Sequence, residues 1–65
     1  MEIIKCTALD KGWEFAEIQP DKQYTRFRKF EDIFDVWHTL TVRIIKNNKT
    51  SYYRDNTEED VCKLL

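Results

Sequence analysis

The 65-residue sequence contains one glycine, one proline and one histidine, and its net charge is only −1. A single glycine excludes a glycine-rich phosphate-binding loop. The balanced charge argues against a strongly basic nucleic-acid-binding domain and against a highly acidic DNA mimic, because both classes depend on a strong field of one sign. No apolar run approaches the roughly 18–20 residues that span a bilayer, so we expect no membrane partner.

The amino-terminal stretch MEIIKCTALDKG lacks the long apolar region and the cleavage site of a secretory signal peptide. We therefore expect a cytoplasmic protein, located in the cell that produces it or in an infected cell. Cys6 and Cys62 are then expected to stay reduced, because disulfides are rare in that compartment.

Residues that could support catalysis or hold a metal are scarce. His38 is the single histidine, so acid–base or nucleophilic chemistry has few groups to use. A zinc site built from Cys6, His38 and Cys62 would lack a fourth ligand and the short paired spacings that such sites show. We expect no enzyme activity, no catalytic residue, no metal and no cofactor.

Aromatic residues, in contrast, are abundant at 14% of the chain, and 42% of the residues are hydrophobic. Large rings bury much area per residue, which suits a small core. A chain of this length forms one domain at most, so we expect a single domain over residues 1–65. The small size also favours a homodimer, formed through an edge strand or by burying spare rings.

The first 19 residues read as a β-hairpin. Glu2 to Leu9 and Trp13 to Gln19 are the expected strands, and Gly12 stands where a three-residue loop needs a left-handed residue. Both faces of this hairpin are partly apolar, which leaves two alternatives open. Either the small residues are buried and Leu9, Trp13 and Phe15 point outward, or the aromatic face forms the core.

The stretch from Tyr24 to Leu40 has apolar residues at helical spacing. Six of them fall within an arc of about 140° on a helical projection, namely Phe27, Phe30, Ile33, Phe34, Trp37 and Leu40. A period of two would instead place Tyr24, Arg26, Arg28 and Phe30 on one face. We therefore predict a helix from about Lys29 to His38, and we expect Phe30, Ile33, Phe34 and Trp37 in the core.

Beyond Thr39, β-branched residues predict a second hairpin. Asn47 and Asn48 tolerate positive φ, so a two-residue turn should pair Lys46 with Lys49. The same register places Ile44 opposite Ser51, Val42 opposite Tyr53, Ile45 opposite Thr50 and Arg43 opposite Tyr52.

The last element is a short helix. Thr57 to Asp60 resembles a capping box, with acidic residues in the first turn where the helix dipole favours them. The predicted order is thus ββαββα, an α+β fold in which a central and a C-terminal helix pack on an antiparallel sheet made of two β-hairpins.

These features favour a small non-enzymatic protein that acts by protein–protein contact. A concrete version is an inhibitor of a host protein, such as a defence nuclease, encoded by a phage or a mobile element. The candidate partner-binding residues are an aromatic group and an acidic group, namely Trp13, Phe15, Leu9, Asp55, Glu58, Glu59 and Asp60. If both helices pack on one face of the sheet, a second acidic group, Glu31, Asp32 and Asp35, is expected to extend the acidic patch.

A nucleic-acid interface is the alternative interpretation. Basic residues alternate with rings in two stretches of the chain, and rings amid phosphate-binding cations are the working parts of single-strand binders. The residues of this alternative are Arg26, Arg28, Lys29, Arg43, Lys46 and Tyr52. Acidic residues lie close to both stretches, so nucleic acid is the less favoured partner.

Overall fold

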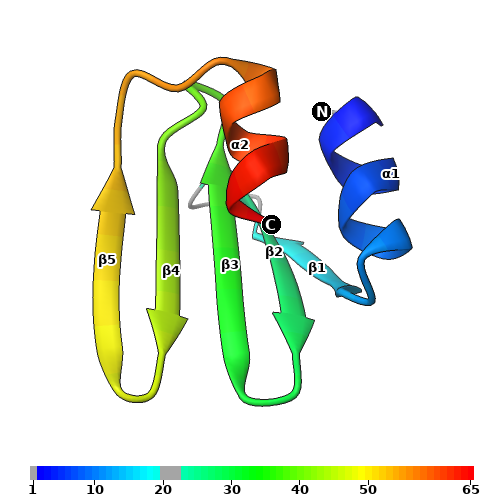
Figure 1. Cartoon of the computed structure of the whole chain (residues 1–65), viewed down its shortest axis with the longest axis vertical. Coiled ribbons are helices and arrows are strands. Elements are labelled where there is room, and N and C mark those ends of the chain that lie inside the picture. The colour runs from blue at the N-terminus through cyan, green and yellow to red at the C-terminus, as the bar shows by residue number, and fades with distance from the viewer. Residues whose placement is uncertain (1, 20–22) are drawn as a thin grey trace.

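The computed structural model describes residues 2–19 and 23–65, without the side chains of residues 17–19. The elements, in chain order, are α1 (Glu2–Asp10), β1 (Glu14–Gln19), β2 (Tyr24–Lys29), β3 (Asp32–Trp37), β4 (Val42–Lys46), β5 (Lys49–Tyr53) and α2 (Glu58–Leu64). The strands form one five-stranded antiparallel sheet in the order β1-β2-β3-β4-β5, and both helices lie on the same face of it (Figure 1). The α+β class is confirmed, whereas the predicted ββαββα order is wrong.

The core lies between the two helices and the sheet. Its buried hydrophobic residues come from every layer, namely Ile4, Ala8, Trp13, Phe27, Phe34, Val36, Val42 and Val61. Within residues 2–19 and 23–65, neither helix has the length and apolar character that a membrane span requires.

The first predicted strand is a helix. Ile4 and Ala8 lie one turn apart on α1 and are both fully buried, which is the spacing of a helical contact stripe. The predicted hairpin between Glu2 to Leu9 and Trp13 to Gln19 therefore does not form. The pattern of apolar and polar residues in this segment fits both the period of two of a strand and the period of 3.6 of a helix. The segment forms a helix because its apolar residues then pack against the sheet and α2.

Gly12 does adopt the predicted left-handed conformation, but it ends a helix and not a hairpin strand. Its φ is +91°. The Gly12 amide donates to the Leu9 carbonyl at 3.1 Å, and the Trp13 amide donates to the Ala8 carbonyl at 2.9 Å. These two bonds are those of a Schellman motif, with Gly12 as the residue after the helix cap.

The predicted central helix is also wrong, since the chain forms a hairpin there. Strands β2 and β3 pair along six positions, from Tyr24 opposite Trp37 to Lys29 opposite Asp32. Phe30 occupies the turn with a φ of +56° and a 96% exposed side chain. Of the four expected core residues on this stretch, only Phe34 is buried against the helices.

The second hairpin is confirmed. Asn47 and Asn48 both have positive φ, at +52° and +64°, as a type I′ turn requires. Lys46 faces Lys49 and Val42 faces Tyr53, and the other predicted pairs between β4 and β5 also form.

The capping box of α2 is confirmed as well. The Thr57 hydroxyl accepts from the Asp60 amide at 3.1 Å, and the Asp60 carboxylate accepts from the Thr57 amide at 3.0 Å. These two bonds satisfy donors that otherwise have no partner at a helix start.

Thr57→Ala is expected to lower the free energy of unfolding by about 1 kcal/mol, the usual loss for removing such a cap. Urea denaturation of both proteins at pH 7 measures this difference. The Glu58→Ala variant, which changes an acidic residue of the same turn without a capping bond, should lose less. Equal losses in the two variants would contradict a capping role for Thr57.

The same bonds make the stability of α2 depend on pH. The hydrogen bond that the Thr57 backbone amide donates to the Asp60 carboxylate, with the neighbouring Thr57 hydroxyl, lowers the pKa of Asp60. A lowered pKa in the folded state stabilises the protein above the unfolded value of about 3.9, and this contribution disappears as the pH falls through the folded value. The difference in stability between the wild type and Asp60→Ala should therefore shrink below about pH 4.

Candidate interaction surface

Neither described helix covers the second face of the sheet. Successive side chains of a strand point to opposite faces, so Phe27 and Phe34 point toward the helices while Arg26 and Asp35 point away from them. We call the helix-free group the arginine face. It comprises Arg26, Arg28, Arg43 and Arg54 with the rings of Tyr24, Trp37 and Tyr52.

Asp35 organises the centre of the arginine face. Its carboxylate is fully buried and lies on β3 between Arg26 on β2 and Arg43 on β4, which are its direct cross-strand partners. Arg26 donates from Nε to Oδ1 at 2.8 Å and from Nη2 to Oδ2 at 3.1 Å. Arg43 donates to Oδ2 from Nε at 3.0 Å and from Nη2 at 2.6 Å. One carboxylate thus fixes two guanidinium groups.

This arrangement also sets the charge of both arginines. The hydrogen bond to Asp35 raises the pKa of Arg26. Burial opposes the charge of Arg43, but the hydrogen bonds to Asp35 and the negative charge of Asp35, with the nearby hydroxyls of Tyr52 and Tyr24, outweigh it, so the pKa of Arg43 is raised as well. Both guanidinium groups are therefore charged at neutral pH.

Three rings surround the arginines. Tyr24 and Trp37 face each other across β2 and β3 with ring centroids 4.9 Å apart. The guanidinium carbon of Arg43 lies 5.3 Å from the centre of the Tyr24 ring and 5.1 Å from that of Trp37, within the range of cation–π attraction. Tyr52, opposite Arg43 on the edge strand β5, is 57% exposed.

A shallow hollow lies at one end of the arginine face. Its lining comes from the ends of β3 and β5 and the loop after β3, namely Trp37, Thr39, Thr41, Tyr52 and Arg54. The hollow gives a partner side chain access to two rings and one arginine.

The structure brings together only part of the residues predicted for nucleic acid. Arg26, Arg28, Arg43 and Tyr52 belong to the arginine face, whereas Lys29 and Lys46 lie on the helix-covered face. Tyr24 and Arg54 belong to the two stretches in which the sequence alternates basic residues with rings, whereas the places of Asp35 and Trp37 in this site were not predicted. The alternation of Tyr24, Arg26 and Arg28 along the sequence indicates that these three residues lie on one face, because side chains two positions apart in a strand point the same way.

The residues predicted for a protein partner do not form one cluster. Trp13 is buried in the core, Leu9 is an exposed residue of α1, and Phe15 is partly exposed beneath Lys5, whose Nζ lies 4.3 Å from the ring centre. The acidic partner-binding candidates, Asp55, Glu58, Glu59 and Asp60, are exposed at the start of α2 and just before it.

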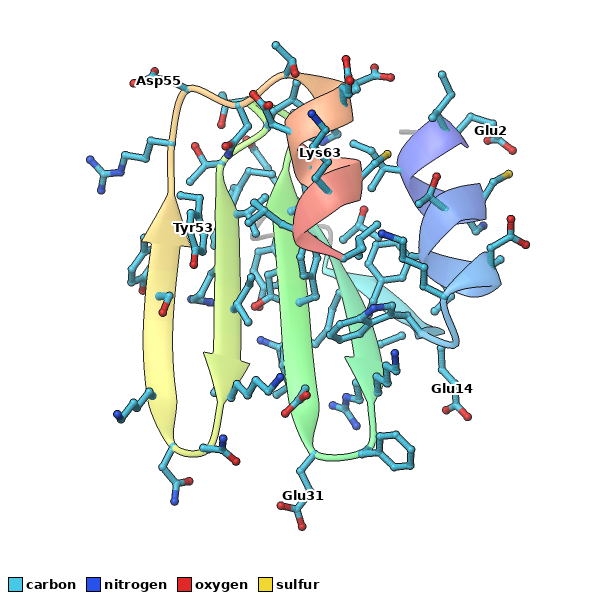
Figure 2. All side chains as sticks on the ribbon, viewed as in Figure 1. Glu2, Glu14, Glu31, Tyr53, Asp55 and Lys63 are labelled. Carbon is cyan, nitrogen blue, oxygen red and sulfur yellow. The ribbon has the colours of Figure 1, made fainter. Side chains whose placement is uncertain are left out.

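The expected merger of the two acidic groups does not occur. Glu31 lies at the turn between β2 and β3, at the opposite end of the sheet from Asp55 (Figure 2). Asp35 is buried on the arginine face and is paired with two arginines. The acidic groups therefore lie on different parts of the molecule.

The cysteines and the histidine are placed apart. Cys6 is exposed on α1, and the half-buried Cys62 lies with its Sγ 3.6 Å from the hydroxyl of Thr7. His38 is exposed in the turn after β3 and not at a helix end. Among the residues that the structure describes, no three His, Cys, Asp or Glu side chains gather as a metal site would need.

The side chains of the arginine face can form hydrogen bonds, ion pairs and stacking contacts. Guanidinium groups donate hydrogen bonds in a fixed fork, and the rings provide flat surfaces for stacking. A partner that presents carboxylates, rings or phosphates would meet complementary groups there. No family model matches the chain, and no curated protein or solved structure shows significant similarity to it.

Proposed function

We propose that this chain is a small non-enzymatic binding protein, and that the arginine face is the surface with which it contacts a protein partner. The observation that supports this most is the placement of all four arginines of the chain with Tyr24, Trp37 and Tyr52 on a sheet face that no described helix covers. Arginine, tyrosine and tryptophan are the residues that most often dominate the binding energy of protein interfaces.

None of the described lysines lies on the arginine face, so arginine alone supplies its positive charge. Lys5, Lys11 and Lys63 belong to α1, to the turn after it and to α2, while Lys29, Lys46 and Lys49 lie on the helix-covered side of the sheet. Lysine is depleted at interface cores because its flexible, strongly hydrated ammonium is costly to order. An acidic segment of a partner protein would fit this face. An inhibitor or adaptor is the class of binding protein that suits a chain of this size.

Single-stranded nucleic acid is the second candidate, and the exposed ring of Tyr52 next to Arg54 favours it. Rings and cations on a sheet face can stack bases and bind phosphates. However, Arg26 and Arg43 already neutralise Asp35, which leaves Arg28 and Arg54 as the freer cations of this face. Two such cations can make only a few phosphate contacts, and the net charge of the chain is −1. A protein is therefore favoured over a nucleic acid as the partner.

The decisive comparison is between Tyr52→Ala and Leu9→Ala. Tyr52 is 57% exposed on the arginine face, and Leu9 is 49% exposed on α1, on the other side of the sheet. In capture experiments with the tagged protein, followed by quantitative mass spectrometry, Tyr52→Ala should lower the recovery of a specific partner at least about fivefold. Leu9→Ala should leave it unchanged, and circular dichroism should show both variants folded.

The opposite result would overturn the proposal. If Leu9→Ala loses the partner and Tyr52→Ala keeps it, the contact surface lies on the helix side. A titration against single- and double-stranded oligonucleotides at low salt, about 50 mM, tests the second candidate, because phosphate contacts are strongest there. Binding that requires Tyr52 and weakens steeply with salt would assign the arginine face to nucleic acid and not to a protein.

A further inference from the structure

Phe30 is the most exposed large hydrophobic residue that the structure describes, with 96% of its side chain accessible. It lies in the two-residue turn between β2 and β3, and its φ is +56°. This conformation is unfavourable for a bulky side chain and suits glycine, so the backbone is strained to present the ring to solvent. Its neighbour Glu31, also exposed, completes the turn.

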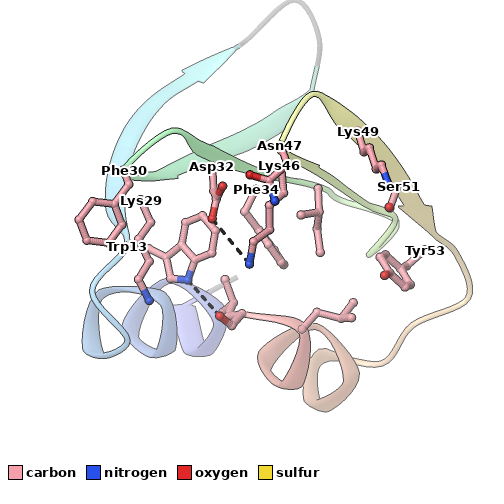
Figure 3. A pocket seen from close by; sticks show the side chains of 13 residues that line it. Trp13, Lys29, Phe30, Asp32, Phe34, Lys46, Asn47, Lys49, Ser51 and Tyr53 are labelled. Atoms are coloured by element: carbon pink, nitrogen blue, oxygen red, sulfur yellow. Dashed lines mark hydrogen bonds and ion pairs between the residues drawn. The ribbon is translucent and has the colours of Figure 1, made fainter.

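A groove opens beside this turn, between the sheet and the end of the chain (Figure 3). Its volume is about 630 Å³, within the roughly 300–1,000 Å³ of pockets that hold a ligand. Apolar side chains from β3, β4, β5 and α2 line it, namely Phe34, Ile44, Tyr53 and Leu64. Lys46 and Lys49 lie on its rim, at the turn between β4 and β5 (Figure 3).

We propose that the groove binds the Phe30–Glu31 turn of a second copy of this chain, which forms a symmetric dimer. The groove reaches the end of the molecule that carries the turn, and Phe30 itself is one of the groove's lining residues. A twofold axis at this end therefore brings each turn to the groove of the partner, and the contact closes without leaving a free turn or groove. The phenyl ring meets the apolar floor.

Charge complementarity supports the same occupant. The turn presents the carboxylate of Glu31 next to the Phe30 ring, and the groove presents lysines next to its apolar floor. Lys46 lies 4.0 Å from the Asp32 carboxylate, whereas Lys49 forms no ion pair with any residue that the structure describes. Lys49 is therefore the residue we assign to Glu31 of the second copy.

The first test is the mass of the particle in solution. Sedimentation equilibrium from about 1 µM to about 1 mM should show the wild type passing from the mass of one chain to that of two, as expected for a weak and small interface. Phe30→Gly should raise the dimer dissociation constant about 30-fold or more, because truncating an interface anchor has that effect. Its urea midpoint should be equal or higher, since glycine relieves the strained φ.

The second test exchanges the charges. Glu31→Lys should raise the dissociation constant about fivefold or more, because each contact occurs twice in a symmetric dimer. The double variant Glu31→Lys with Lys49→Glu should recover the wild-type value, which a nonspecific loss would not do. Tyr52→Ala, on the other face of the sheet, is the matched control and should dimerise like the wild type.

Two results would overturn the dimer. One is a wild type that stays monomeric at about 1 mM. The other is a dimer that Phe30→Gly does not weaken, which would place the contact elsewhere, such as the exposed edge strand β5. Neither result bears on the arginine face, because partner capture is tested separately with Tyr52→Ala. Phe30→Gly should retain that partner if both proposals hold.

Discussion

Replacing Trp13 with alanine is expected to lower the free energy of unfolding by about 3–5 kcal/mol, the usual cost of truncating a buried tryptophan. Trp13 connects three parts of the fold that are distant in sequence. Its ring contacts Phe34 on β3 edge-to-face with centroids 5.6 Å apart, and its Nε1 donates to the main-chain oxygen of Leu65 at 3.1 Å. The Trp13 backbone also takes part in the C-terminal cap of α1, because its amide donates to the Ala8 carbonyl.

A loss of this size is a large part of the roughly 5–15 kcal/mol that stabilise a small domain. Urea denaturation monitored by circular dichroism should therefore show Trp13→Ala as partly or fully unfolded in buffer. Trp13→Phe keeps a ring and removes the indole donor, so it should lose clearly less. Wild-type stability of Trp13→Ala would contradict a core role and would return Trp13 to the candidates for partner contact.

The C-terminal half of the fold was predictable because its signals are local. Asn47 and Asn48 tolerate the positive φ of a type I′ turn, and that turn alone fixes every pair between β4 and β5. Thr57 and Asp60 satisfy each other's amides within one helical turn. Neither result depends on what the rest of the chain does.

The hairpin of β2 and β3 was not predictable in the same way. Its turn contains Phe30 at positive φ, a residue type that carries no turn signal. The apolar residues of the two strands are divided between both faces of the sheet, with Phe27 and Phe34 toward the helices and Trp37 on the arginine face. If the turn at Phe30 is not recognised, the apolar residues of both strands show the spacing expected for the apolar stripe of one helix.

The segment of α1 shows a different limit of sequence reasoning. The break at Gly12 was located correctly, and so was its left-handed conformation. Whether the residues before it form a strand or a helix depends on where Ile4 and Ala8 are buried, and they pack in the core with Val61, 53 or more positions further along. Tertiary contacts of this kind override weak local preferences.

The arginine face depends on which residues of neighbouring strands lie opposite each other, and the sequence alone does not show this pairing. A period of two along β2 places Tyr24 and Arg26 together, but nothing in the chain indicates that Asp35 lies opposite Arg26 and Arg43 until both hairpins are paired. The acidic residue was therefore grouped with Glu31 and its neighbours. In the structure it is the one described charged residue that is fully buried.

Asp35→Ala is the second substitution with a large expected effect, a loss of about 2–4 kcal/mol in the free energy of unfolding. Removing one partner of a fully buried ion pair costs about 3–5 kcal/mol, because the remaining charge is left without compensation. The side chains of Arg26 and Arg43 keep 20% and 21% of their exposure, so water replaces part of the lost interaction. Urea denaturation at pH 7 measures the difference.

Two further measurements distinguish a role of the three charged residues in stability from a role in partner binding. Asp35→Ala leaves two guanidinium groups facing each other, so added salt should restore part of its stability by screening their repulsion. Replacing Arg26, Asp35 and Arg43 together by Met, Leu and Met removes every charge at once, and such exchanges are often neutral or stabilising. We therefore expect the triple variant to fold with near wild-type stability but to lose binding to the protein partner that we propose for the arginine face. A triple variant that still binds would show that the three charges serve the fold and not the contact.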